Sequence, residues 1–297
     1  MNKTIFKGTC TACITPFTQD GIDYDALERQ IEFQIAHGID ALCILGTTGE
    51  APTITDSEYD YIAKFAYDKI AGRVKYILGS GSNCTKKAID KSVLAEKIGA
   101  DGLLVVTPYY NKCTQKGLVK YYNDICDSVN IPILCYNVPA RTGVNILPQT
   151  MAEIAEHRNI GGIKEACGNM EQICETARLI RGKTALYSGD DNLNLAMLSI
   201  GSMGLISVAS NVAPKEVGFV AKYYFAGENE KAVELQERLL PLIDQMFTEV
   251  NPIPVKKAMQ LIGLDSGIVR APLTELEDAH QKTLISVLKD FGLSIKE

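Results

Sequence analysis

Eight short apolar runs recur along the chain, and amphipathic segments of helical length separate them. Near-continuous apolar strands that alternate with helices are typical of parallel strands covered on both faces. Eight such units favour a closed (β/α)8 barrel, of the TIM-barrel type, over an open doubly wound sheet. The predicted strands are Gly8–Ile14, Ala41–Leu45, Val74–Leu78, Gly102–Val106, Ile133–Tyr136, Ile160–Lys164, Ala185–Ser188 and Gly204–Val208.

The intervening segments carry recognisable helix signals. Pro148 and Pro214 stand where a first-turn proline is favoured, and glycines follow His37, Ile98 and Ile200 at the expected helix ends. The predicted helices are Tyr24–Ala36, Asp56–Ile70, Lys86–Ile98, Lys116–Ser128, Pro148–Glu156, Met170–Ile180, Asn192–Ile200 and Pro214–Phe225.

Beyond residue 225 the pattern becomes purely helical. Three further helices are expected over Glu230–Phe247, Pro254–Ile262 and Glu275–Phe291, with a kink at Pro241. We therefore expect a barrel domain over 1–225 and a C-terminal three-helix appendage over 226–297, with no flexible linker between them.

Composition narrows the function classes. The chain has 297 residues, 46% of them hydrophobic, which suits a single large barrel. A net charge of −6 argues against a nucleic-acid partner. No apolar run reaches 18 residues and the N-terminus lacks a signal-like apolar stretch, so we expect a cytoplasmic protein without a membrane partner. Neither a G-x-G-x-x-G fingerprint nor a P-loop is present.

Nothing in the sequence indicates a metal site or a cofactor. The nine cysteines are odd in number and scattered, which favours reduced thiols. Cys10 and Cys13 lie three apart in a predicted strand, so they point to opposite faces. The histidines are far apart in sequence, at positions 37, 157 and 280. We therefore expect neither metal nor cofactor.

Chemically useful groups follow the predicted strands at their carboxyl ends, where barrel enzymes build their active sites. Each has an ordinary explanation: glycine-rich loops turn, tyrosines pack, and arginines lie on surfaces. Together they supply a lysine, tyrosines, hydroxyls and an arginine for one barrel mouth. The segments are Gly46–Glu50, Thr107–Asn111, Tyr136–Gly143, Lys164, Ser188–Asp191 and Ile206–Ser207.

Lys164 ends an apolar run and is the central candidate. An unpaired ammonium in an apolar site is costly, and the neutral amine that burial favours adds to carbonyl groups. A simpler interpretation is a lysine that reaches water and pairs with Glu165. The surrounding groups favour Schiff-base chemistry on a small α-keto acid, with Lys164 as the nucleophile.

Three motifs resemble the pyruvate-dependent class I aldolase family: Gly-Thr-Thr-Gly-Glu at 46–50, Tyr-Asn-x-Pro-x-Arg-Thr-Gly at 136–143 and Gly-Ile-Lys-Glu-Ala at 162–166. The resemblance covers the chain from Gly8 to the C-terminal helices. It implies a lyase in which a pyruvate imine on Lys164 tautomerises to an enamine that adds to L-aspartate 4-semialdehyde. This is the first committed step of lysine (diaminopimelate) biosynthesis, and it needs no cofactor.

Other functions stay open at this stage. An N-acetylneuraminate lyase or a 2-keto-3-deoxy sugar acid aldolase belongs to the same family, although the neuraminate lyases usually lack the Arg-Thr-Gly of 141–143. A barrel that only binds a metabolite or scaffolds a complex is a further alternative, of a different class.

The resemblance also assigns roles to individual residues. Tyr136 matches the tyrosine beside the imine, and Thr47 and Tyr110 match the rest of a proton relay to solvent. Thr48 matches the pyruvate carboxylate site, and Arg141 matches the residue that holds the carboxylate of the second substrate. Two further positions match backbone that lines the pocket, namely Gly189 and Ile206.

Assembly and regulation follow from the same resemblance. The tyrosine that matches Tyr110 reaches into the neighbouring subunit's site, which implies a homodimer or homotetramer. Lysine-sensitive members bind lysine beside the tyrosine matching Tyr109, and Asn83 is also retained here. Elsewhere this chain departs from them, so we expect insensitivity to lysine; Ala51, Pro52, Asp56, Tyr59 and Lys87 replace Ser, Ala, His, His and Glu.

Overall fold

The structure is a computed structural model that describes residues 4–296. Within that range, eight strands form a closed barrel in chain order. Register is recorded for six neighbouring pairs, and all six are parallel. The predicted (β/α)8 architecture is confirmed. The strands are β1 Gly8–Ala12, β2 Ala41–Ile44, β3 Lys75–Gly79, β4 Gly102–Val106, β5 Ile133–Asn137, β6 Ile160–Glu165, β7 Ala185–Ser188 and β8 Gly204–Ser207.

Four helices have the predicted bounds, namely α1 Tyr24–Ala36, α2 Asp56–Ile70, α7 Met170–Ile180 and α9 Pro214–Phe225. Their starts are locally encoded: Thr55 and Glu58 form a capping box at α2, and Asp23 caps α1. The remaining helical elements are α3 Thr85–Ile98, α4 Gln115–Ser128, α5 Pro139–Thr142, α6 Pro148–Ile154, α8 Asn194–Ser199, α10 Asn229–Gln245, α11 Ile253–Leu261 and α12 Asp278–Phe291, with 3-10 turns η1 Ala51–Thr53 and η2 Ala209–Asn211.

At two elements whose bounds differ from prediction, a side chain from elsewhere in the chain accepts a hydrogen bond from the backbone. The strand predicted to reach Ile14 ends at Ala12, and the Ile14 N–H donates to Asn211 Oδ1 at 3.2 Å. Helix α12 begins three residues later than predicted, because the N–H of Glu277 donates to Glu249 at 2.9 Å and Glu277 is extended. Pro241 lies inside α10, which continues to Gln245.

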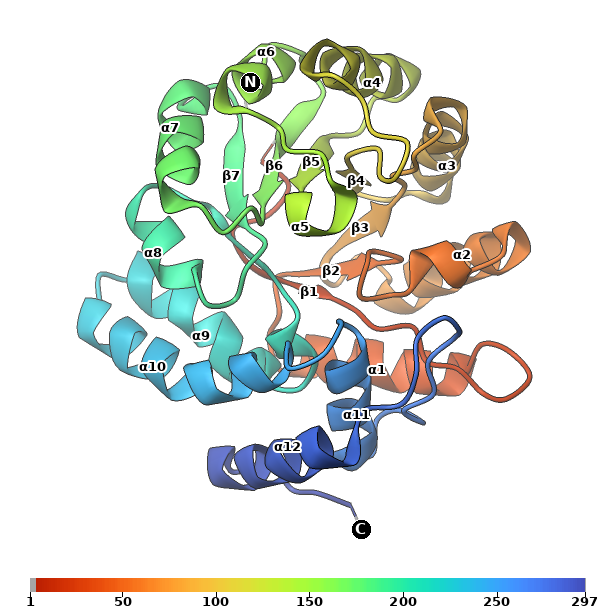
Figure 1. Ribbon diagram of the computed structural model, residues 1–297, viewed down its shortest axis with the longest axis vertical. Coiled ribbons are helices and arrows are strands. Elements are labelled where there is room, and N and C mark those ends of the chain that lie inside the picture. The colour runs from red at the N-terminus through yellow and green to blue at the C-terminus, as the bar shows by residue number, and fades with distance from the viewer. Residues whose placement is uncertain (1–3, 297) are drawn as a thin grey trace. The chain divides into compact units, whose positions relative to one another are not determined.

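The chain divides into two compact units, each packed mainly within itself. The first comprises Lys75–Ile206 with residues 4–7, and the second comprises Gly8–Val74 with residues 207–296. In the second unit, α10 packs against α9 and α12, and α11 packs against α12 (Figure 1). The C-terminal helices predicted from sequence are therefore present; a domain boundary at 225/226 stays a prediction.

No disulfide joins any of the nine cysteines, all of which lie within the described range. Cys10 and Cys13 are both buried, and each thiol lies near the carbonyl of Thr11. No helix between residues 4 and 296 has both the length and the apolar character that crossing a membrane requires.

Candidate functional site

Lys164 and Tyr136 lie side by side at the carboxyl ends of β6 and β5, where the strand register pairs them directly. Lys164 is 5% exposed, and its Nζ lies 4.3 Å from the centroid of the Tyr136 ring. No carboxylate in the described part of the chain forms an ion pair with Lys164. An amino group held against an aromatic face, without a countercharge, suits a nucleophile.

Gly189 provides the space that the Lys164 side chain occupies. A Cβ at position 189 would stand 2.9 Å from Cε and 3.0 Å from Cγ of Lys164, closer than real contacts allow. The backbone at this point is fixed, because the Gly189 N–H donates to the Glu165 carbonyl at 2.8 Å. The pocket-lining position predicted at Gly189 thus contacts the lysine alkyl chain, and Ile206 is fully buried in β8.

A polar network holds the same two strand ends from their other face. Asn137 Nδ2 donates to both carboxylate oxygens of Glu165, at 2.9 and 3.1 Å, and to Asn145 at 2.9 Å. Glu165 is fully buried; burial raises its pKa, while the bonds from Asn137 and the Cys167 N–H oppose that rise. Because side chains alternate along a strand, this network fixes the strands that present Lys164 and Tyr136.

The Tyr-Asn-x-Pro-x-Arg-Thr-Gly motif begins in the last two residues of β5 and continues into the one-turn helix α5, which the sequence pattern did not predict. Thr142 Oγ1 donates to the carbonyls of Val138 and Val144 and holds this turn closed. Gly143 ends it with φ +69°, a conformation that glycine adopts without strain. Arg141 is exposed on α5, directly after the strand that carries Tyr136.

Tyr110 is an exposed aromatic residue in the loop after β4. Its side chain is 91% exposed, and its φ of +69° is uncommon for a residue other than glycine. Asn111, beside it, donates to the Asn83 carbonyl at 2.9 Å, which ties this loop to the one after β3. The loop therefore presents a large aromatic side chain to the surroundings.

The second compact unit carries the Gly-Thr-Thr-Gly-Glu loop after β2. Thr47 is half-buried, and Thr48 is 3% exposed, with its Oγ1 accepting a hydrogen bond of 3.0 Å from Asn251 Nδ2. Gly49 has no room for a Cβ without crowding the Cys13 carbonyl and the Leu45 backbone. The Thr48 hydroxyl, which is predicted to hold a carboxylate, therefore lies in a tightly packed part of this loop.

Lys256 in α11 is a second buried lysine that sequence reasoning missed. It is 0% exposed, and its Nζ donates to Glu50 Oε1 and to the Thr15 carbonyl, both at 2.8 Å. Its Nζ also lies 3.9 Å from the centroid of the Phe17 ring. Desolvation lowers the pKa of Lys256, against the opposing effect of Glu50. The sequence did contain a signal that Lys256 is buried, because Lys256 lies on the same helix face as the apolar residues Ile253 and Met259.

Arg270 completes this network. Its backbone N–H donates to Glu50 Oε2 at 3.0 Å, and its guanidinium forms a two-pronged pair with Glu58. The hydrogen bonds from Arg270 lower the pKa of Glu58 to about 2. Glu50 thus accepts hydrogen bonds on both carboxylate oxygens.

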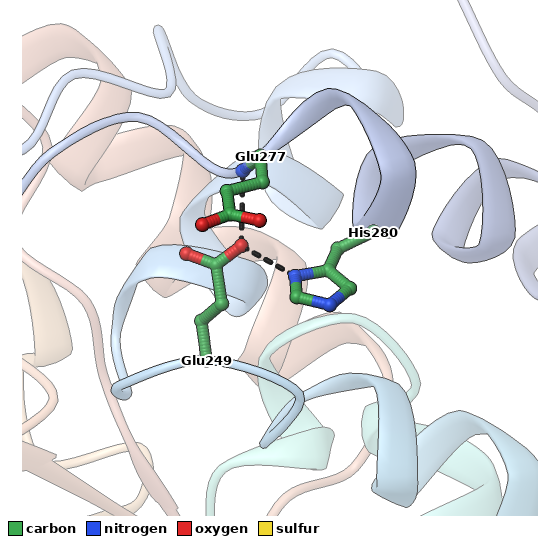
Figure 2. Close-up of side chains that lie close together, drawn as sticks. All are labelled: Glu249, Glu277 and His280. Carbon is green, nitrogen blue, oxygen red and sulfur yellow. Dashed lines mark hydrogen bonds and ion pairs between the residues drawn. The ribbon is translucent and has the colours of Figure 1, made fainter.

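One group of residues in the range 4–296 has side chains close enough to hold a metal ion, namely Glu249, Glu277 and His280 (Figure 2). The sequence did not associate His280 with any carboxylate. Glu249 Oε1 already accepts hydrogen bonds from the Glu277 N–H at 2.9 Å and from His280 Nδ1 at 2.7 Å. These two hydrogen bonds explain why the three side chains lie together: they anchor the start of α12.

One class of enzymes combines a closed (β/α)8 barrel with a buried lysine that has no countercharge, at the carboxyl end of a strand. In this class the lysine amine adds to a carbonyl group of the substrate. Residues 5–291 match the model of the dihydrodipicolinate synthetase family. The 4-hydroxy-tetrahydrodipicolinate synthase of Caldicellulosiruptor bescii is 47% identical over 295 residues, covering 99% of this chain and 100% of that protein. The chain therefore belongs to the dihydrodipicolinate synthetase family, as the motifs predicted.

Solved structures agree with this assignment. The dihydrodipicolinate synthase of Thermotoga maritima has a TM-score of 0.95 at 42% identity, covering 97% of this chain and 99% of that one. A structure described as the first monomeric dihydrodipicolinate synthase variant has a TM-score of 0.96 at 42% identity, with 98% of each chain covered.

Proposed function

We propose that this protein is a lyase that condenses pyruvate with L-aspartate 4-semialdehyde to form 4-hydroxy-tetrahydrodipicolinate. The observation that carries the proposal is Lys164, buried against Tyr136 and without a countercharge among the described residues. Family membership supports the choice of substrates, since the matched relatives carry the name of this synthase. The enzyme would act in the cytoplasm, in lysine biosynthesis.

The proposed reaction balances without an external oxidant, metal or cofactor. The Lys164 amine adds to the keto carbon of pyruvate and water leaves, forming an imine. Loss of a methyl proton gives an enamine, whose carbon attacks the aldehyde. The amine of the semialdehyde then attacks the imine carbon, which closes the ring and releases Lys164.

The other residues have proposed roles around this chemistry. Tyr136, Thr47 and Tyr110 relay protons, and Thr48 with the backbone N–H groups of the threonine loop holds the pyruvate carboxylate. Arg141 holds the carboxylate of the second substrate. Supporting contacts are the Lys164–Tyr136 approach and the close packing around Thr48.

A coupled assay tests the function directly. Purified protein should consume pyruvate only when L-aspartate 4-semialdehyde is supplied, and it should not cleave N-acetylneuraminate. Cleavage of N-acetylneuraminate or of a 2-keto-3-deoxy sugar acid at a comparable rate would instead assign the chain to a sister activity.

We expect Arg141→Ala to lower kcat/KM for the semialdehyde by about 30-fold with little change in the pyruvate KM. A side chain paired with a carboxylate typically contributes about 2–5 kcal/mol, and the exposure of Arg141 favours the lower end. Steady-state kinetics with each substrate varied would measure this. Arg178→Ala, which removes an exposed arginine paired with Glu175, is the matched control. Equal effects of the two variants on kcat/KM would show that Arg141 does not hold the carboxylate and is an ordinary surface charge.

We expect lysine at low millimolar concentration to leave the activity unchanged. Lys87 is exposed on α3 and would repel the ammonium of an effector where an acid would attract it. Tyr59 is buried within α2, so it offers no exposed ring in place of a histidine. Lysine titration in the coupled assay checks this, and Lys87→Glu should increase sensitivity. Cooperative inhibition of the unaltered protein would show that the substitutions do not act as argued.

We expect the active protein to be a homodimer or homotetramer. The exposed Tyr110 is the supporting observation, because a large side chain on a strained turn suits insertion into a neighbouring subunit. Sedimentation at assay concentration checks assembly, and a fully active monomer would exclude it.

Tyr110→Phe should lower kcat at least about tenfold, by removing a proton-transfer group. Tyr61→Phe is the control, since Tyr61 is an exposed tyrosine of α2.

A further inference from the structure

The loop Gly46–Glu50 is held in a conformation that its own sequence does not favour. Glu50 has φ +53°, in the left-handed region that residues with a side chain rarely adopt. Such a conformation persists only where surrounding contacts over-determine it. Here the contacts come from distant parts of the second unit: Thr15 Oγ1 donates to the Gly49 carbonyl at 2.7 Å, and Lys256 and Arg270 bond to the Glu50 carboxylate.

Helix α11 and the residues that lead into it contact this loop twice. Lys256 neutralises the buried carboxylate of Glu50, which fixes the end of the loop. Asn251, which is buried, donates from Nδ2 to Thr48 Oγ1, which fixes its middle. Both contacts are therefore made by residues more than 200 positions away in the sequence.

The bond from Asn251 also determines what the Thr48 hydroxyl can do. A threonine hydroxyl has one hydrogen to donate and accepts through its lone pairs. Because Asn251 occupies a lone pair, the hydrogen of Thr48 is directed elsewhere, and in the described range Thr48 Oγ1 donates to no acceptor. An oriented O–H without a protein acceptor is suited to an anionic oxygen of a ligand.

We infer that Asn251 is a positioning residue that acts through Thr48: it orients the Thr48 hydroxyl as a hydrogen-bond donor to the carboxylate of the keto acid. Lys256 and Glu50 support it by holding the loop in place. The inference rests on the proposed function, because it requires a keto-acid substrate. It gives Asn251 a role in carboxylate selectivity and none in the chemistry of the imine.

The test compares two ketones that differ in the carboxylate. Pyruvate and acetone both form imines with a lysine amine, and borohydride reduction traps each as a stable adduct. The unaltered protein should be trapped far more efficiently by pyruvate. In Asn251→Ala that preference should fall at least about tenfold, the effect of losing one hydrogen bond to a charged group, while the rate with acetone is unchanged.

Two further variants separate orientation from general damage. In Asn251→Asp, the introduced carboxylate would draw the Thr48 hydrogen toward itself, so the preference for pyruvate should fall at least as far as in Asn251→Ala. Asn159→Ala is the matched control: Asn159 is a buried asparagine whose amide donates to the Cys126 and Val129 carbonyls, and it should keep the preference. Circular dichroism confirms that each variant is folded.

A double-mutant cycle completes the test. In a Thr48→Val background, Asn251→Ala should change the pyruvate preference by less than about twofold, because the two residues act on one interaction. Additive effects, or an equal loss of trapping with both ketones, would overturn the inference while leaving the proposed function intact. Absence of any pyruvate adduct on the unaltered protein would overturn both.

Discussion

Lys164→Ala is expected to abolish the condensation, with kcat/KM reduced by a factor on the order of 10⁴ or more, because it removes the amine proposed to form the imine. Burial of Lys164 beside Tyr136, with space provided by Gly189, is the structural reason. Treatment of the unaltered protein with pyruvate and borohydride, followed by peptide mass spectrometry, should place the adduct on Lys164.

Lys256 provides the internal comparison for this experiment. It is more deeply buried than Lys164, yet its amine is engaged by Glu50 and by the Thr15 carbonyl. Burial alone would favour Lys256 as the nucleophile, whereas its pairing with the Glu50 carboxylate argues against it and favours Lys164. An adduct on Lys256, or its persistence in Lys164→Ala, would falsify the proposed mechanism.

The second large effect concerns stability. Lys256→Met is expected to lower the free energy of unfolding by about 3–5 kcal/mol, because it leaves the Glu50 carboxylate buried without its countercharge. Lys120→Met is the matched control; Lys120 forms an exposed pair with Asp124, and such pairs contribute about 0.5 kcal/mol. Urea unfolding measures both variants.

A double variant tests the physical cause. Adding Glu50→Gln to Lys256→Met removes both charges, so much of the lost stability should return. If the double variant is as unstable as the sum of the two single variants, then packing rather than charge accounts for the effect.

Much of the fold could be predicted because local patterns encode it. Apolar runs bounded by glycines gave β4 and β7 their observed bounds, and capping residues located the start of α2. The short α5 and the late start of α12 were missed, since each depends on contacts with particular side chains. The hydrogen bond that the Glu277 N–H donates to Glu249 is one such contact. The hydrophobic periodicity of the sequence does not predict it.

The residues of the candidate site also divide into those that the sequence predicts and those that it does not. The residues that stand at strand ends, such as Lys164 and Tyr136, could be found because a barrel brings strand ends to one edge. Asn251 and Lys256 could not be assigned, because their importance comes from partners in another part of the chain. The buried face of α11 offered a hint for Lys256, but nothing in the sequence named Glu50 as its partner.

The separation of Glu50 from its partners has a consequence for biosynthesis on the ribosome. Glu50 is made early, whereas Lys256 and Arg270 follow 206 and 220 residues later. Until those residues emerge, the nascent chain has no countercharge for this carboxylate, and closing so long a loop is entropically costly. Lys75–Ile206 is one continuous stretch and can begin to fold earlier. The contacts that hold the loop proposed to select the keto acid are therefore completed only late in translation, and a chain that terminates before α11 would lack those made by Lys256 and Arg270.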